Sequence, residues 1–81
     1  MDLVALTDYL IKSIVEEAEA VSVKLFDDTE DTVVIQVLVS ENDMGSVIGK
    51  GGTTAQSIRT IVQASSYLKE NKLVKINFDS F

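Results

Sequence analysis

Apolar residues recur at steps of three and four along the first part of the chain, which is the period of an α-helix. The positions are Leu3, Leu6, Leu10, Ile11, Ile14, Val15 and Ala18. This pattern predicts an amphipathic helix from Leu3 to Ala18. Because Glu16, Glu17 and Glu19 lie at the negative end of the helix dipole, we expect the last turn to fray.

Two segments typical of strands follow. Residues 21–25 alternate between apolar and polar side chains with period two. Residues 32–39 are rich in β-branched side chains, with Val33, Ile35, Val37 and Val39 on one face. The polar residues 27–31 separate them. Two strands around a five-residue polar loop predict an antiparallel hairpin. We expect Phe26, in its apolar setting, to pack in the core.

The pattern then returns to helix. Asn42 and Asp43 are suitable caps for a short helix from Met44 to Ile48, which the following glycines end. A longer helix is predicted from about Thr53, since Thr53 and Gln56 have the spacing of a capping box. Its expected buried stripe is Ile58, Ile61, Val62, Ser65 and Leu68.

The last element is a strand. Asn71 is a plausible C-terminal stop for the preceding helix. Val74, Ile76 and Phe78 alternate with polar residues, and we expect Phe78 to pack in the core. The elements fit a single α+β domain over residues 1–81, with the helices packed on one face of a three-stranded sheet.

Three of the four glycines fall together, at positions 49, 51 and 52, between two predicted helices. Glycine adopts positive φ readily and lets another backbone approach closely. The second helix begins with unpaired N–H groups, which favour an anion such as phosphate, and Lys50 adds a positive charge. Flanking Val47, Ile48 and Ile58 could form an apolar groove. A plain connection between two helices explains the glycines equally well, so this pattern alone leaves both interpretations open.

The amino-acid composition excludes several kinds of catalytic and metal-binding site. The chain has no Cys and no His, which removes thiolate chemistry, disulfides and the usual zinc ligands. No constellation of a nucleophile and a base is present, so we expect no enzyme, no metal and no cofactor. The glycine spacing fits neither a Walker A loop nor a dinucleotide fingerprint. The acidic run 27–31 lacks the spacing of a calcium-binding loop, and we interpret it as a solvated turn.

The segment Val47–Arg59 resembles the signature of KH domains, in which a GXXG loop joins two helices; here that loop is Gly49-Lys50-Gly51-Gly52. The element order resembles the type II arrangement, α-β-β-α-α-β with a three-stranded mixed sheet. From Leu3 to Phe78 the chain is similar to the small stand-alone KhpA family. The site residues that this resemblance implies are Val47, Ile48, Gly49, Lys50, Gly51, Gly52, Thr53, Ile58 and Arg59.

The resemblance also implies a function and partners. It implies a cytoplasmic bacterial protein that binds single-stranded RNA, with about four nucleotides clamped by the loop. It further implies a homodimer or pairing with a larger KH-containing protein of the Jag type, and a part as regulator or RNA chaperone in cell elongation and division. Neither a signal peptide nor a membrane span is expected.

The net charge of −6 is unusual for a nucleic-acid binder. Family members usually carry basic residues just after the GXXG loop, where this chain has Thr53 and Gln56. A protein-interaction module on the same scaffold therefore stays open as the alternative. Arg59 either contacts phosphate or is a solvated position. We expect self-association through apolar surface near the glycine turn or its flanking helices, because Met44, Val47 and Ile48 cannot all point inward.

Overall fold

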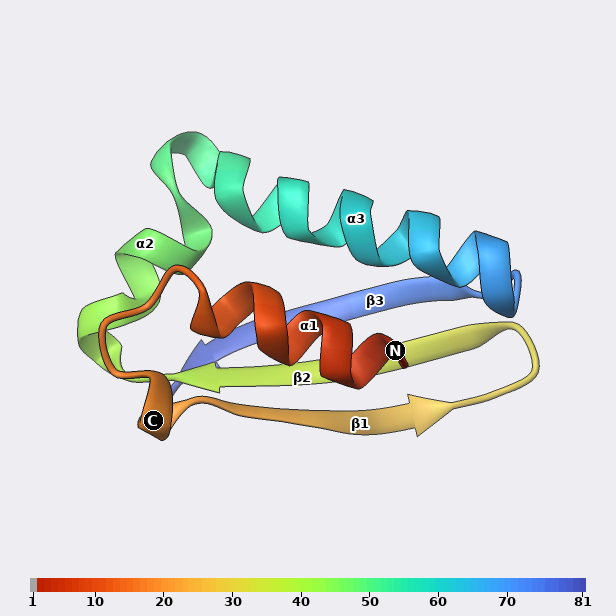
Figure 1. Cartoon of the computed structure of the whole chain (residues 1–81), viewed down its shortest axis with the longest axis horizontal. Helices are drawn as coiled ribbons and strands as arrows, with labels where there is room; N and C mark the ends of the chain where they lie inside the picture. The colour runs from red at the N-terminus through yellow and green to blue at the C-terminus, as the bar shows by residue number, and fades with distance from the viewer. Residues whose placement is uncertain (1) are drawn as a thin grey trace.

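The computed structural model describes residues 2–81, which fold into a sheet layer and a helix layer (Figure 1). The elements are α1 (Leu3–Lys12), β1 (Ser22–Asp28), β2 (Thr32–Val39), α2 (Met44–Ile48), α3 (Thr53–Lys69) and β3 (Leu73–Ser80). Short 3-10 turns lie at Ala18–Ala20, Glu41–Asp43 and Lys50–Gly52. The predicted order of elements is confirmed. None of the helices in this described range has the length and apolar character needed to cross a membrane.

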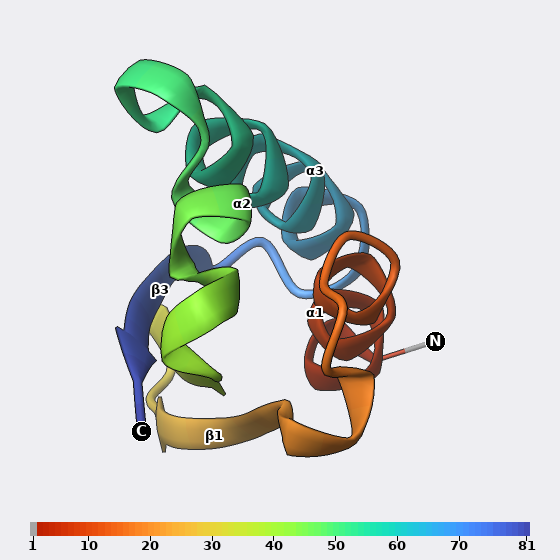
Figure 2. The same ribbon diagram turned by 90° about the vertical axis from the view of Figure 1, so that its left-hand side faces the viewer.

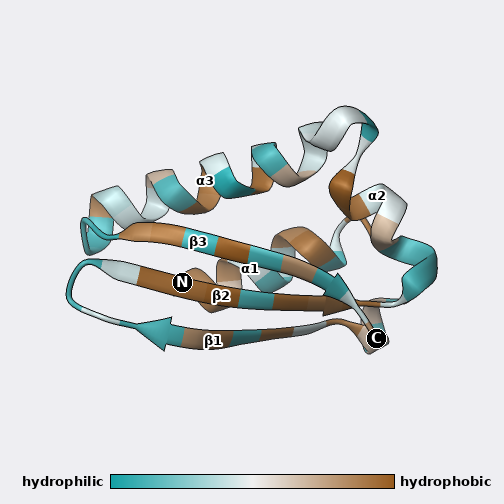
Figure 3. Ribbon diagram, turned by 180° about the vertical axis from the view of Figure 1, so that it is seen from behind, coloured by the Kyte–Doolittle hydropathy of each residue, from teal (hydrophilic) through white to brown (hydrophobic). Residues whose placement is uncertain are grey.

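The sheet is mixed, with the strand order β1-β2-β3. β1 pairs antiparallel with β2, as the hairpin prediction requires, while β3 pairs parallel with β2 from Thr32↔Leu73 to Val39↔Ser80. Viewed from behind, the strands lie in front of the helices, so one face of the sheet carries no helix (Figure 3). The predicted α+β layout, with helices on a single face, is confirmed.

The core lies between these layers. It is built around β2, whose alternate residues are fully or almost fully buried, and it also takes side chains from α1, α2, α3 and β3. Its buried members are Leu3, Ile11, Val33, Ile35, Val37, Val39, Val47, Ile58, Val62 and Ile76. The packing confirms the face of β2 that the sequence pattern selects.

The first helix is shorter than its apolar pattern predicts, since it ends at Lys12 and not near Ala18. The backbone N–H groups of Glu16 and Glu17 donate to the two carboxylate oxygens of Asp43, each at 3.0 Å. Because these N–H groups bind Asp43, they do not continue the hydrogen-bonding pattern of the helix. Residues 13–20 therefore form a connection to β1 outside the α-helix. Asp43, predicted as a helix cap, makes no cap hydrogen bond to α2.

Asp43 is almost completely buried, with 2% of its surface exposed. The backbone hydrogen bonds from Glu16 and Glu17 lower the pKa of its carboxyl group, against the opposing effect of burial, and a hydrogen bond from Ser40 lowers it further. Ser40 also donates to the Glu17 carboxylate at 2.7 Å. Asp43 therefore links the connection after α1 to the start of α2.

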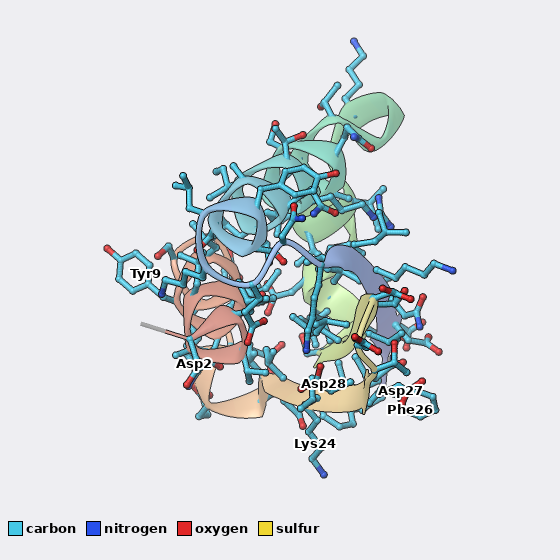
Figure 4. All side chains as sticks on the ribbon, turned by 90° about the vertical axis from the view of Figure 1, so that its right-hand side faces the viewer. Asp2, Tyr9, Lys24, Phe26, Asp27 and Asp28 are labelled. Carbon is cyan, nitrogen blue, oxygen red and sulfur yellow. The ribbon has the colours of Figure 1, made fainter. Side chains whose placement is uncertain are left out.

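Phe26 is 72% exposed, so its predicted place in the core is wrong. Leu25 lines a hollow on the helix side of the sheet, which turns its neighbour Phe26 to the other face, and the pairing with β2 shifts at a bulge between Leu25 and Asp27. Figure 4 shows Phe26 pointing away from the helices.

The buried stripe of α3 also differs from the prediction. It consists of Ala55, Ile58, Val62 and Ser66, while Ile61 and Leu68 are 47% and 88% exposed. The difference arises because Ser66, a small polar residue, is buried through hydrogen bonds between its hydroxyl and the backbone of Lys72. The predicted stop is confirmed, since α3 ends at Lys69 and Asn71 adopts φ 57°.

Candidate nucleic-acid interface

The glycine turn between α2 and α3 protrudes at one end of the molecule (Figure 2). Its three glycines all have positive φ, at 77° for Gly49, 65° for Gly51 and 81° for Gly52. The Gly52 N–H donates to the Gly49 carbonyl at 3.1 Å and closes the turn. Because L side chains rarely adopt this conformation, the clustering of glycines has a backbone cause.

Gly49 meets a second restriction, which is space. A Cβ at this position would lie 2.8 Å from the backbone nitrogen of Thr54 and would overlap the Thr54 side chain. By contrast, a Cβ at Gly51 would meet no atom within 4 Å. Gly49 therefore allows the turn to pack against the start of α3, whereas Gly51 lies at the open tip.

The start of α3 is suited to an anion. Gly52 is its N-cap and has no side chain with which to cap it, and the first turn contains no acidic residue. The capping box expected of Thr53 and Gln56 is not formed, because the Thr53 hydroxyl instead donates to the Lys50 carbonyl at 2.9 Å. With Lys50 exposed beside it, this helix start combines dipole, N–H groups and charge.

A shallow groove of about 430 Å³ runs along α3 and reaches β3. Its lining residues are Gln56, Arg59, Thr60, Gln63, Ala64, Tyr67 and Val74. We call it the α3–β3 groove. Gln56 and Arg59 lie within two helical turns of Thr53, so the groove begins close to the glycine turn.

Side chains of α3 cover the outer edge of β3, which pairs with no strand of residues 2–81. The Gln63 amide accepts from the Val74 N–H and donates to the Lys72 carbonyl, both at 2.8 Å. One turn earlier, Arg59 donates to the Ile76 carbonyl at 3.3 Å, and its guanidinium lies over the Phe78 ring, 4.9 Å from the centroid. These contacts hold α3 against β3 along the side of the α3–β3 groove.

The structure divides the predicted site residues into two groups. Gly49, Lys50, Gly51, Gly52 and Thr53 form the turn and the helix start, and Arg59 lines the groove. Val47 and Ile58 are instead core residues, with 0% and 5% of their surfaces exposed. Their side chains anchor the ends of α2 and α3 in the core and expose almost no surface to a ligand. Ile48 is half-buried beside the turn.

Phe78 and Gln63 are functional candidates that the sequence prediction missed. Phe78 was expected only as core, and it does pack partly against the core cluster. Gln63 lies one helical turn beyond the signature on α3, whereas Phe78 is distant from it in sequence. The parallel pairing of β3 with β2 brings Phe78 beside Arg59, and no local pattern indicates that contact.

The acidic hairpin turn at residues 29–31 lies at the end of the molecule opposite the glycine turn (Figure 1). A larger hollow of about 540 Å³ lies near that turn, and its charged lining residues are Asp2, Asp28, Glu70 and Lys69. The excess of carboxylates repels phosphate, so this hollow does not suit a nucleic acid. The charge segregation places much of the acidic surface away from the candidate interface.

The family model described as KhpA/KhpB, KH domain, matches residues 5–78. The chain is 41% identical over 71 residues to RNA-binding protein KhpA of Clostridium perfringens, covering 88% of this chain and 92% of the relative. It is 42% identical over 65 residues to RNA-binding protein KhpA of Caldanaerobacter subterraneus subsp. tengcongensis, covering 80% and 84%.

Solved structures show a similar fold at low sequence identity. Aquifex aeolicus Era, bound to GDP and aluminium fluoride, superposes with a TM-score of 0.77 at 13% identity. That match covers 98% of this chain and 30% of the Era chain. Era in complex with MgGDPNP and nucleotides 1506–1542 of 16S ribosomal RNA gives a TM-score of 0.70 at 17% identity, covering 96% and 29%. At these identities the likeness concerns the fold alone.

Proposed function

The chain belongs to the KhpA/KhpB family of KH-domain proteins, and from this premise we propose that it binds short single-stranded RNA through the glycine turn and the α3–β3 groove. Its fold is the type II KH arrangement. The family consists of RNA-binding proteins and not of enzymes, in agreement with the sequence prediction. Relatives named for RNA binding support the RNA itself as the partner.

The observation that carries the proposal is the glycine turn. Three positive-φ glycines present the start of α3 beside the exposed Lys50, and an apolar-walled groove leads away from it. In this arrangement the turn holds the sugar-phosphate chain, while the unstacked bases lie along α3 and β3. The proposed role is that of a cytoplasmic regulator or RNA chaperone linked to cell elongation and division, and it rests on the family resemblance.

RNA affinity should be weak and should depend only shallowly on salt. Lys50 is exposed at the turn, Arg59 lines the groove, and Lys75 is exposed on β3. Two or three phosphate contacts to a single strand give a slope of log K against log salt of about −1.4 to −2. Fluorescence anisotropy with a labelled RNA of about eight nucleotides, between about 50 and 200 mM salt, measures it. A slope near about −6 would mean a basic surface elsewhere, such as one created by assembly.

The protein-interaction alternative has its own support, which is exposed apolar surface on α3. Met44, Val47 and Ile48, expected to form an apolar patch at the turn, are buried or half-buried. Ile61 and Leu68, seven residues apart on α3, are exposed instead. We propose that a homodimer, or a pair with a larger KH-containing partner of the Jag type, forms through this face.

Replacing Ile61 by Asp should therefore split a dimer without unfolding the protein, because a carboxylate in an apolar contact would be desolvated. Sedimentation at about 100 μM compares the masses of the two proteins. Tyr9→Asp, at an exposed aromatic on α1, is the matched control and should leave the dimer intact. A wild-type monomer under these conditions would contradict the homodimer, and a dimer that survives in Ile61→Asp would place the interface elsewhere.

A further inference from the structure

Arg59 is held in one orientation by two contacts from β3. Its Nη2 donates to the Ile76 carbonyl at 3.3 Å, and its guanidinium lies over the Phe78 ring at 4.9 Å. The separation is within the range of a cation–π interaction. Because both partners lie on a paired strand of the sheet, the guanidinium has a rigid support.

The guanidinium also borders the α3–β3 groove, and the residue is only half-buried. The guanidinium therefore lies between the Phe78 ring, which supports it, and the groove, where a ligand can reach it. Guanidinium planes stack on nucleobases, and their delocalised charge is weakly hydrated. An ammonium group offers the same charge but no plane.

We propose that Arg59, backed by Phe78, is a stacking platform for one base of the bound RNA and not a phosphate contact. The inference rests on the proposed function and goes beyond it, because it assigns base recognition to a residue outside the glycine turn. Phe78 acts as the positioning residue that holds the guanidinium beside the groove. Phosphate contact stays with Lys50 and the start of α3, which lie toward the other end of the path.

The test separates the base contribution from the phosphate contribution. Two labelled probes of about eight units are compared, an oligoadenylate and a chain of abasic ribose phosphates of the same length. The ratio of their affinities measures what the bases add. Arg59→Lys keeps the charge, so the salt slope and the affinity for the abasic chain should not change. The ratio should fall about tenfold, which corresponds to the loss of one stacked base.

Three further variants check the geometry. Phe78→Leu removes the ring under the guanidinium but keeps Arg59, and the ratio should fall as it does in Arg59→Lys. Tyr67→Leu removes the other aromatic side chain of the groove, two helical turns further along α3, and tests whether stacking occurs there instead. Tyr9→Leu, at an exposed aromatic on α1 outside the groove, is the control and should retain the ratio. Melting curves of each variant show whether the fold is preserved.

The outcomes are distinct. An unchanged ratio in Arg59→Lys overturns the platform, as does an equal loss of affinity for both probes in Arg59→Ala, which would indicate a phosphate contact. A ratio that falls only in Tyr67→Leu places stacking at that residue and also overturns it. If the wild-type protein binds neither probe at low salt, the proposed function fails and the platform fails with it.

Discussion

Replacing both Lys50 and Gly51 with Asp should abolish RNA binding while the protein stays folded. The two carboxylates would stand at the tip of the glycine turn, where the proposed function places phosphate. Loss of the Lys50 charge and gain of two repulsive charges should lower affinity by roughly 30-fold or more at low salt. Anisotropy with a labelled RNA measures the loss.

The fold should tolerate this change because both positions are exposed and a Cβ at Gly51 meets open space. The φ of 65° at Gly51 adds a strain of about 1 kcal/mol, since Asp is among the few residues that visit this region. The neutral variant Lys50→Gln with Gly51→Asn is the matched control, because Asn tolerates the same backbone conformation. If the Asp variant melts close to wild type and binds RNA equally well, the turn is not the phosphate clamp.

The second large effect concerns stability and comes from Asp43. Asp43→Asn should lower the melting temperature by roughly 5–10 °C at neutral pH. Each carboxylate oxygen of Asp43 accepts from one backbone N–H, of Glu16 or of Glu17. The amide oxygen of Asn can accept from only one of them, and its NH₂ group would face the other N–H in a buried site. Thermal unfolding followed by circular dichroism measures the change. Asp8→Asn, at a half-buried carboxylate that pairs with Lys12 on the surface of α1, is the control and should shift the melting temperature little.

The same carboxylate gives the difference a pH dependence. Because the folded-state pKa of Asp43 lies below its ordinary value of 3.8, the ionised group stabilises the fold fully above that pH. This contribution is lost as the pH falls through the lowered folded-state pKa. The gap between wild type and Asp43→Asn should therefore be constant near neutrality and narrow in acid. Equal melting temperatures at neutral pH would contradict the assignment.

The elements that local patterns encode were predicted well. The bounds of α2 and the start of α3 agree with the sequence because the glycines and helix formers act within a few residues of themselves. Asn71 ends α3 through its own left-handed conformation. The buried face of β2 carries Val33, Ile35, Val37 and Val39, as predicted. The glycine turn, as the core of the candidate site, belongs to this predictable group.

What the sequence did not predict depends on contacts between distant residues. The end of α1 is set by Asp43, which lies 27 positions beyond Glu16 in the chain. The exposure of Phe26 depends on which face of the sheet the helices leave uncovered. The Arg59–Phe78 contact requires β3 to return parallel to β2, and the hydrophobic pattern of a strand does not specify its partner.

The bridge that Gln63 makes to β3 has a consequence for the behaviour of the protein in concentrated solution. An edge strand with unpaired N–H and C=O groups is a template on which another chain can add, the first step of sheet-driven aggregation. Gln63 supplies one acceptor and one donor, as a neighbouring strand would, and so occupies that template over Lys72 and Val74. At the other edge, β1 carries a bulge and the charges of Asp27 and Asp28, which discourage the same event. The fold therefore protects both edges of a three-stranded sheet against uncontrolled extension, with Gln63 and Arg59 at one edge and a bulge with two carboxylates at the other.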